Sequence, residues 1–161
     1  MKLADVELTD GNHFVAMEYY YLIFNRTFLV IKTNGYLIGI QGNGLVSVEG
    51  GDGIITPTVT SLLAVKGDLT NPYSYLKNKY LEKVVGLDLL DGSITEANKF
   101  NFLMKLSDIK SAVYNSAKKW GMGPYPHDGT VTVETYDNKK REFIILGNQS
   151  GQSIADLISA K

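Results

Sequence analysis

The chain of 161 residues contains no cysteine. This absence excludes thiol nucleophiles, disulfide frameworks and cysteine-based zinc sites. It is also typical of proteins from a reducing compartment, so we expect a cytoplasmic location. Without disulfides the fold must depend on its hydrophobic core. A chain of this length is large enough to bury one, and we expect a single domain over residues 1–161.

The chain also lacks an excess of charge and a long apolar run. Its 16 basic and 17 acidic residues leave a net charge of −1, which argues against a nucleic-acid binder because such proteins attract phosphates with a basic field. Acidic residues near Met1 occupy the place where a signal peptide has its apolar core, so we interpret Met1 as the mature start. Between residues 14 and 31 the longest uncharged apolar run covers residues 19–24, which is the length of a strand and not of a membrane span.

The clearest pattern in the chain covers residues 28–48, where two β-rich runs meet at Asn34-Gly35. This dipeptide predicts a type I′ turn, because both of its residues readily adopt positive φ. A one-residue slip would bury polar side chains, so the apolar pattern fixes the register. The predicted register joins Thr33 with Tyr36, Ile31 with Ile38, and Leu29 with Ile40.

Other segments predict further strands from their alternation or apolar content. They are a short edge strand at Leu3, Val6 and Leu8, a strand over residues 19–24 that is interrupted at Asn25-Arg26, a strand over residues 45–48 after a turn at residues 42–44, and a strand from Phe100 and Phe102 to Leu106. A second hairpin is predicted from residues 131–136 and 141–146, around Asp137-Asn138.

The segment from residue 49 onward changes character and predicts a loop followed by a helix. Residues 49–53 are a glycine-rich loop, and the Thr-rich residues 54–65 fit either a strand or irregular structure. Asn71 is a good N-cap and Pro72 suits the first helical position, so a helix should begin there. Its apolar stripe recurs at spacings of three and four and ends before Gly86: Tyr73, Leu76, Tyr80, Leu81 and Val84.

The last third of the chain contains one ambiguous segment. Residues 107–120 fit a helix with a stripe from Ile109 to Trp120, but the same residues could also open a strand. Residues 121–129 predict a loop. Ile154, Leu157 and Ile158 mark one face of a short terminal helix, with Ser150 as its cap, and so short a helix must dock on the sheet to be stable.

Few residues suggest catalysis. Both histidines, His13 and His127, lie in turn contexts with no visible second member of a catalytic pair. Residues 147–151 superficially resemble a nucleophile elbow, but Asn148 and Gln152 stand where that motif requires glycine. We therefore expect no catalytic residue, no metal ligand and no cofactor.

Two groups of residues suggest binding. Five lysines against one aspartate give residues 99–119 a charge of about +4, which fits an acidic partner, a lipid head group or an ordinary solvated face. Tyr19, Tyr20, Tyr21, Tyr73, Tyr75 and Tyr80 fit either a self-association surface or a covered sheet. The candidate binding residues are Lys118, Lys119, Trp120, Tyr125, His127 and Asp128.

Four short motifs carry a family likeness. They are residues 33–38 (Thr-Asn-Gly-Tyr-Leu-Ile), residues 106–109 (Leu-Ser-Asp-Ile), the hairpin around Asp137-Asn138 and the helix at residues 154–158. Over residues 17–48 and 98–160 the chain resembles bacterial pleckstrin-homology (PH) and GRAM-like domains. The resemblance implies an α+β, mainly β fold: a PH-like antiparallel barrel or strongly bent sheet, with an inserted segment at about residues 50–97 and a C-terminal capping helix. It also implies that the chain from Ile109 onward is a strand.

The resemblance implies a non-enzymatic module that binds a lipid head group, a peptide or another copy of itself. Family members that bind phosphoinositides carry a basic cluster at the first hairpin, where this chain has only Lys32. We therefore expect protein or peptide binding or a homo-oligomer, with membrane lipid and nucleic acid as unlikely partners. The alternatives are a weak anionic-lipid binder, or a small enzyme whose loop at residues 120–129 uses His127 and Asp128 as acid and base.

Overall fold

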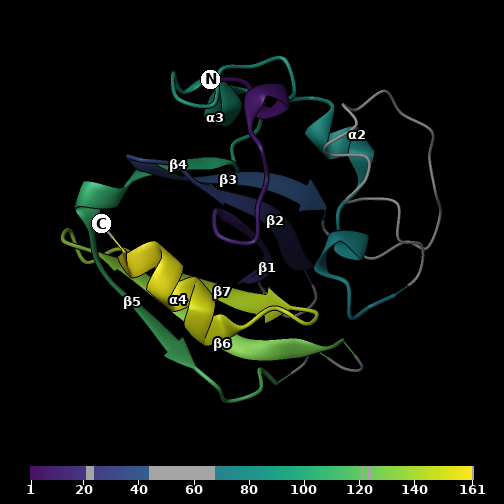
Figure 1. Cartoon of the computed structure of the whole chain (residues 1–161), viewed down its shortest axis with the longest axis vertical. Helices are drawn as coiled ribbons and strands as arrows, with labels where there is room; N and C mark the ends of the chain where they lie inside the picture. Colours follow the sequence, from purple (N-terminus) through teal and green to yellow (C-terminus); the bar gives the residue numbers. More distant parts are fainter. Residues whose placement is uncertain (21–23, 44–67, 121, 123–124, 161) are drawn as a thin grey trace.

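The computed structural model of the protein describes residues 1–20, 24–43, 68–120, 122 and 125–160. Their centre is one antiparallel sheet in the order β4-β3-β2-β1-β7-β6-β5, curled into a half-barrel (Figure 1). The strands are β1 (His13–Tyr20), β2 (Phe24–Lys32), β3 (Tyr36–Asn43), β4 (Phe102–Lys105), β5 (Ile109–Asn115), β6 (His127–Thr135) and β7 (Lys140–Leu146). The helices are η1 (Leu3–Asp5), η2 (Pro72–Tyr75), α2 (Asn78–Leu81), α3 (Ser93–Ala97), η3 (Leu106–Asp108) and α4 (Gly151–Ser159). The predicted fold class, α+β and mainly β with a C-terminal helix, is confirmed.

The first hairpin confirms the predicted register and corrects the predicted turn. Ile31 pairs with Ile38, and the Thr33 amide donates to the Tyr36 carbonyl over 2.9 Å. Neither residue of Asn34-Gly35 has a positive φ, so the type I′ turn was wrong. Instead, the hydroxyl of Thr33 accepts a hydrogen bond from the Tyr36 amide at 3.1 Å, and this side chain supplies the local bond that closes the turn.

The apolar run at residues 19–24 does not belong to one strand as predicted. Tyr20 ends β1 and pairs with Phe24, which begins β2, and residues 21–23 lie outside the described part of the chain. The predicted interruption at Asn25-Arg26 was also wrong, because both residues lie within β2. Arg26 pairs across the strands with Glu18, so its charge is balanced inside the sheet.

The sheet is covered on both faces, which explains why several strands are apolar on both sides. The inner face packs against α4 and contains Phe14, Ala16, Phe28, Val30, Leu37, Phe102, Ile109, Val131, Val133, Phe143, Ile145, Ile154, Ala155 and Ile158. The outer face packs against residues 68–97 and the N-terminal residues. It contains Leu3, Val15, Met17, Leu29, Ile31, Ile38, Ile40, Tyr75, Leu76, Leu81, Val84, Leu89, Ile94, Met122, Ile144 and Leu146.

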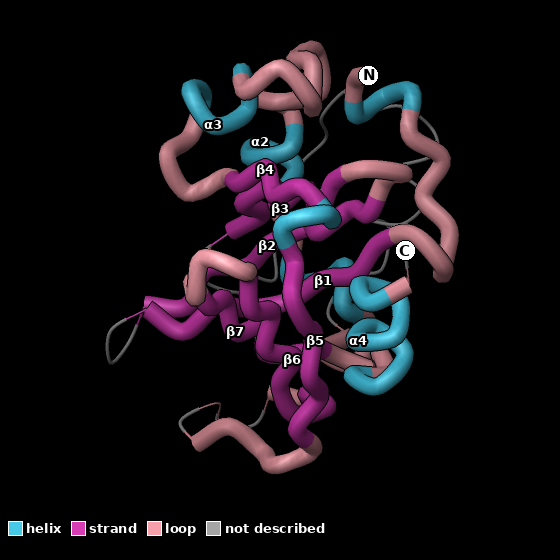
Figure 2. Tube along the Cα trace, turned by 90° about the vertical axis from the view of Figure 1, so that its left-hand side faces the viewer, coloured by secondary structure: helices cyan, strands magenta, loops and turns pink. Residues whose placement is uncertain are grey.

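The helices lie at two separate ends of the sheet. Figure 2 shows α4 beside β5 and β6, whereas α2 and α3 lie near β3 and β4. The C-terminal helix and the helices α2 and α3 therefore cover different strands.

The helix predicted after Asn71 is two short helices. The capping prediction is confirmed, since the Asn71 side chain accepts from the Tyr73 amide at 2.9 Å and Pro72 opens η2. The chain then leaves helical geometry at Leu76, and the Lys77 amide donates to the Gly42 carbonyl of β3 over 3.0 Å. This bond to the sheet replaces an intrahelical one, so Leu76, Leu81 and Val84 are buried without a continuous helix.

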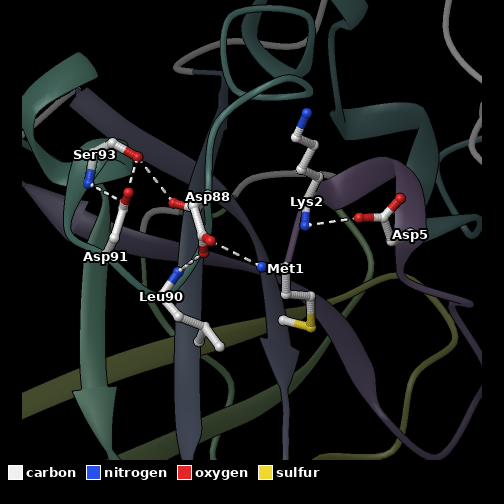
Figure 3. Close-up of polar contacts among 7 residues, drawn as sticks. All are labelled: Met1, Lys2, Asp5, Asp88, Leu90, Asp91 and Ser93. Atoms are coloured by element: carbon white, nitrogen blue, oxygen red, sulfur yellow. Dashed lines mark hydrogen bonds and ion pairs between the residues drawn. The ribbon is translucent and has the colours of Figure 1, made fainter.

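The N-terminal residues form the short helix η1 and not the predicted edge strand. Leu3 is fully buried on the outer face. Figure 3 shows how polar contacts hold this segment: the Met1 amino group donates to Asp88 over 3.0 Å, and the Lys2 amide donates to Asp5 over 3.1 Å. The N-terminal segment is thereby fixed to the chain at Asp88.

The ambiguous residues 107–120 contain a strand and no α-helix. β4 confirms the predicted strand near Phe102, η3 follows it directly, and β5 then pairs with β6. The helical alternative for this segment does not form, because hydrogen bonds across to β6 satisfy the backbone groups of β5. The loop prediction for residues 121–129 was wrong in part, since residues 127–129 open β6 across a register shift before Thr130.

The predicted second hairpin and terminal helix are confirmed. Val131 pairs with Phe143, and the connection contains Asn138 at a φ of 62°. Ser150 caps α4 by accepting from the Ser153 amide at 3.2 Å. Gly42 and Asn43 belong to β3 and not to a turn. The predictions for residues 44–67 lie outside the described residues.

Candidate functional site

The strand β5 ends the described sheet. Within the described residues it pairs only with β6, whereas the opposite end of the sheet is the four-residue strand β4. Its inner side is covered by α4 (Figure 1). On this side Tyr114 donates a hydrogen bond of 2.8 Å to Asp128. Val113 faces the other way and is 59% exposed.

The β5 edge, defined as residues 111–115, is regular and uncharged. These residues pair one to one with Thr130–Glu134 of β6, and a register shift precedes them between Ile109 and Ser111. Proteins usually protect open edges with charged residues, proline or bulges. Only Lys110, at the register shift, offers such protection, and its ammonium group is 2.9 Å from Glu134.

The predicted basic group does not form one positive surface. The ammonium group of Lys119 forms an ion pair with Glu142, and that of Lys118 donates to the carbonyl of His127. Lys99 lies over the ring of Phe100 at 5.1 Å. Lys105 and Lys110 are exposed and lie before β5 or at its start, whereas Lys118 and Lys119 follow its end. A strand of this length spans about 23 Å, so the two pairs of lysines are far apart.

Two of the candidate site residues are held by structural hydrogen bonds. His127 is buried, and its Nε2 accepts from the Lys119 amide at 3.0 Å. Its Nδ1 is 3.0 Å from the Tyr125 carbonyl, so the proton lies on Nδ1. Tyr125 packs edge-on against Tyr75, with ring centroids 6.1 Å apart.

Asp128 caps α4. Its two oxygens accept from the Gly151 amide and from the Tyr114 hydroxyl, each at 2.8 Å. These bonds favour the carboxylate and hold the pKa of Asp128 below its usual value. The structure therefore gives His127 and Asp128 separate partners, whereas an acid and base would need to face one substrate.

Trp120 follows β5 and is 87% exposed, the largest exposed fraction among the exposed large hydrophobic residues described. Its neighbours Lys118 and Lys119 contact β6 and β7 through the bonds described above. The structure thus places the candidate residues 118–120 beside the end of the β5 edge. His127 and Asp128 bond to residues near that end, to the Lys119 amide and the Tyr114 hydroxyl.

The tyrosines predicted as one group are dispersed. Tyr75 is buried against the outer face of the sheet, and Tyr73 is half-buried in a cleft. Tyr19 is 37% exposed, and the ammonium of Lys119 lies 5.8 Å from its ring centroid. Tyr80 has lysines near its ring. The side chains of Tyr20 and Tyr21 lie outside the described residues.

A cleft of about 880 Å³ lies between residues 10–13, 68–73 and 148–157. The sequence did not predict this cleft, because no second catalytic residue is visible near His13 in the sequence. The partner of His13 is Tyr73, sixty positions along the chain, whose hydroxyl donates to Nε2 of the imidazole. No local pattern could have joined these two residues.

His13 is a buried, neutral imidazole. Its Nδ1 donates to the Thr9 carbonyl over 2.7 Å, which leaves Nε2 to accept from Tyr73. Burial lowers the pKa of His13, although the Thr9 carbonyl and the charge of Asp10 act in the opposite direction. Burial also raises the pKa of Tyr73, with a further contribution from Asp10. Both rings are therefore uncharged at neutral pH, and they connect β1 to η2.

The cleft is poorly suited to an anion. The described residues that line it include no lysine or arginine, and Asp10 and Asp68 contribute negative charge. The amides at the N-terminus of α4 already have partners, since Gly151 donates to Asp128 and Ser153 donates to Ser150.

Among the residues that the structure describes, no group of three or more acidic or histidine side chains could hold a metal ion. The helices in the same part of the chain include none long and apolar enough to cross a membrane. In comparisons with known proteins, no family model, no curated protein and no solved structure matches the chain. The function of the protein must therefore be inferred from its own geometry.

Proposed function

We propose that the protein is a non-enzymatic protein-interaction module that binds an extended protein segment along the β5 edge. The observation that carries this proposal is the regular, uncharged edge at residues 111–115, which the described chain leaves without a second strand. An open edge presents backbone donors and acceptors, and an added strand satisfies them.

Exposed hydrophobic residues beside the edge support the same proposal. Val113 is 59% exposed in the middle of it, and Trp120 is 87% exposed just beyond its end. In strand addition the backbone bonds provide affinity and neighbouring side chains provide selectivity. Tryptophan is a frequent anchor in protein interfaces because it buries a large rigid surface.

We further propose that the architecture is PH-like. The strand order joins two runs of consecutive antiparallel strands, β1 to β4 and β5 to β7, through the pairing of β1 with β7, and no pairing joins β4 to β5 among the described residues. The C-terminal helix α4 packs on β5 and β6 beside this opening. These features support the resemblance and are compatible with an interaction module, although a fold alone does not determine function.

To test the proposal, extended peptides that bind the whole protein are selected from a displayed random library. Binders are then tested against Val113→Lys and against Tyr136→Lys, a matched control because Tyr136 is 64% exposed in the β6–β7 connection. We expect at least a tenfold loss of affinity for Val113→Lys only, with amide chemical-shift changes centred on residues 111–115. Binders that map to the cleft and ignore Val113→Lys would contradict the proposal.

A further inference from the structure

Resting on the proposed function, we infer that the strand that occupies the β5 edge is β5 of a second copy of this protein. The two strands run antiparallel, and a two-fold axis passes between the two copies of Val113. The dimer therefore contains one continuous sheet built from both copies.

The regular part of the edge is symmetric about Val113. Residues 111–115 pair regularly with β6, and the register shift lies just before them. Antiparallel pairing about Val113 places Ser111 opposite Asn115 and Ala112 opposite Tyr114. Every residue of the regular segment then has a partner, and the pairing forms about four to six backbone hydrogen bonds, depending on which amides point outward.

The same axis buries the exposed valine. Val113 of one copy faces Val113 of the other, so two side chains that are each 59% exposed cover one another. β-branched residues pack well across a pair of strands. A foreign peptide would need a matching apolar residue, whereas the second copy supplies it by symmetry.

Charge also favours the second copy. The only charged residue of β5 is Lys110, which lies outside the symmetric segment and already has Glu134 as its partner. Residues 111–115 carry no charge, so like charges face each other nowhere when two copies of this segment pair.

Cross-linking tests this register directly, because the chain has no cysteine of its own. Val113→Cys introduces a single thiol that lies against its copy at the axis. We expect mild oxidation to convert Val113→Cys into a covalent dimer at least tenfold faster than Tyr136→Cys, the control with a similarly exposed residue. Equal rates for the two variants would overturn the inference.

Charge reversal provides the second test and does not depend on oxidation. In sedimentation velocity at rising concentration, the parent and Tyr136→Lys should reach twice the monomer mass. Val113→Lys and Val113→Glu should each remain monomeric, because like charges meet at the axis, and an equimolar mixture of the two should dimerise again. This rescue cannot arise from misfolding of either variant.

The outcomes separate the inference from the proposed function. If the parent stays monomeric but library peptides still depend on Val113, the occupant is a foreign segment and only the inference fails. If the parent dimerises and Val113→Lys dimerises equally well, copies associate elsewhere and the inference also fails. If neither peptides nor copies bind at the edge, both proposals fail.

Discussion

His13 and Tyr73 show how one buried pair joins distant parts of the chain. The imidazole donates to Thr9 and accepts from Tyr73, so both of its nitrogens have partners. Protonation of Nε2 would break the bond from the Tyr73 hydroxyl and place a charge in a buried site. The pair should therefore make stability depend on pH.

We expect the free energy of unfolding to rise with pH through 6.5 and then to level off. The pKa of His13 lies below 6.5 in the folded protein, so the unfolded chain binds more protons in the interval between the two values. Stability is thus lost as the pH falls through this interval. Denaturant midpoints from pH 5 to pH 8 should show this slope in the parent and a weaker slope in His13→Gln. Equal slopes would show that His13 does not cause the dependence.

Gly129 illustrates a backbone position that only glycine fits. It has a φ of +63°, and a Cβ there would lie 2.0 Å from the Asn115 carbonyl oxygen. We expect Gly129→Ala to lower the free energy of unfolding by about 2 kcal/mol or more, because the strained φ and the backbone clash add together.

Gly35 provides the control for that substitution. The predicted type I′ turn would make any side chain costly there, but Gly35 has no positive φ, and a Cβ at this position would meet no heavy atom within 4 Å beyond the adjacent residues. We expect Gly35→Ala to stay within about 0.5 kcal/mol of the parent. Urea denaturation of both variants measures the difference, and equal losses would contradict the structure at one of the two glycines.

At the scale of elements, α4 stabilises the inner face of the sheet. Ile154 and Ile158 are buried there, and the helix packs mainly on β5 and β6. Deletion of residues 150–161 should expose this apolar face and leave an aggregating or molten product. Size-exclusion chromatography and dye binding would detect it. A monomeric truncation that unfolds cooperatively would show that the helix is peripheral.

The cap of α4 gives a milder test of the same element. Asp128→Ala removes the acceptor of the Gly151 amide and of the Tyr114 hydroxyl. We expect a loss of about 1–2 kcal/mol in the free energy of unfolding, the usual effect of a lost helix cap. Asp108→Ala is the control, because the Asp108 side chain is exposed and bonds only with Ser107 among the hydrogen bonds described. Similar losses for both variants would mean that the cap contributes little.

At the scale of the whole molecule, the lysines do not combine into a lipid site. Lys32, the lysine nearest the first hairpin, donates to the carbonyls of Leu157 and Ala160 over 2.8 and 2.6 Å and so binds the C-terminal end of α4. Lys110 and Lys119 have acidic partners.

We therefore expect no head-group-selective binding to phosphoinositide vesicles at physiological salt. Any weak attraction to anionic vesicles should depend on Lys118 and its neighbours and disappear as salt screens it. Vesicle sedimentation with phosphoinositide and with phosphatidylserine, at low and physiological salt, makes the comparison. Tight selective binding that survives salt would place lipid above protein as the ligand.

Part of this protein could be predicted from the sequence because the deciding interactions are local. The two-residue alternation around Asn34-Gly35 fixed the pairing of Ile31 with Ile38. The caps at Asn71 and Ser150 depend on neighbours two or three positions away. The same holds for the second hairpin, whose short connection at Asp137-Asn138 brings its strands together.

The tertiary structure decided what depends on distant partners. The helix after Asn71 breaks because the Lys77 amide bonds to Gly42 of β3, and residues 109–115 form a strand because β6 supplies a ladder that outweighs their helical stripe. His127 became a structural residue because the Lys119 amide reaches its ring.

Composition and short residue spacing were enough to predict the fold class, the register of the first hairpin and the absence of thiol chemistry. The strand left at the edge of the described sheet, and the side chains that meet across the cleft, depend on contacts between distant segments. These partners are far apart in the chain and meet only when it folds, and the local pattern of a segment carries no information about them.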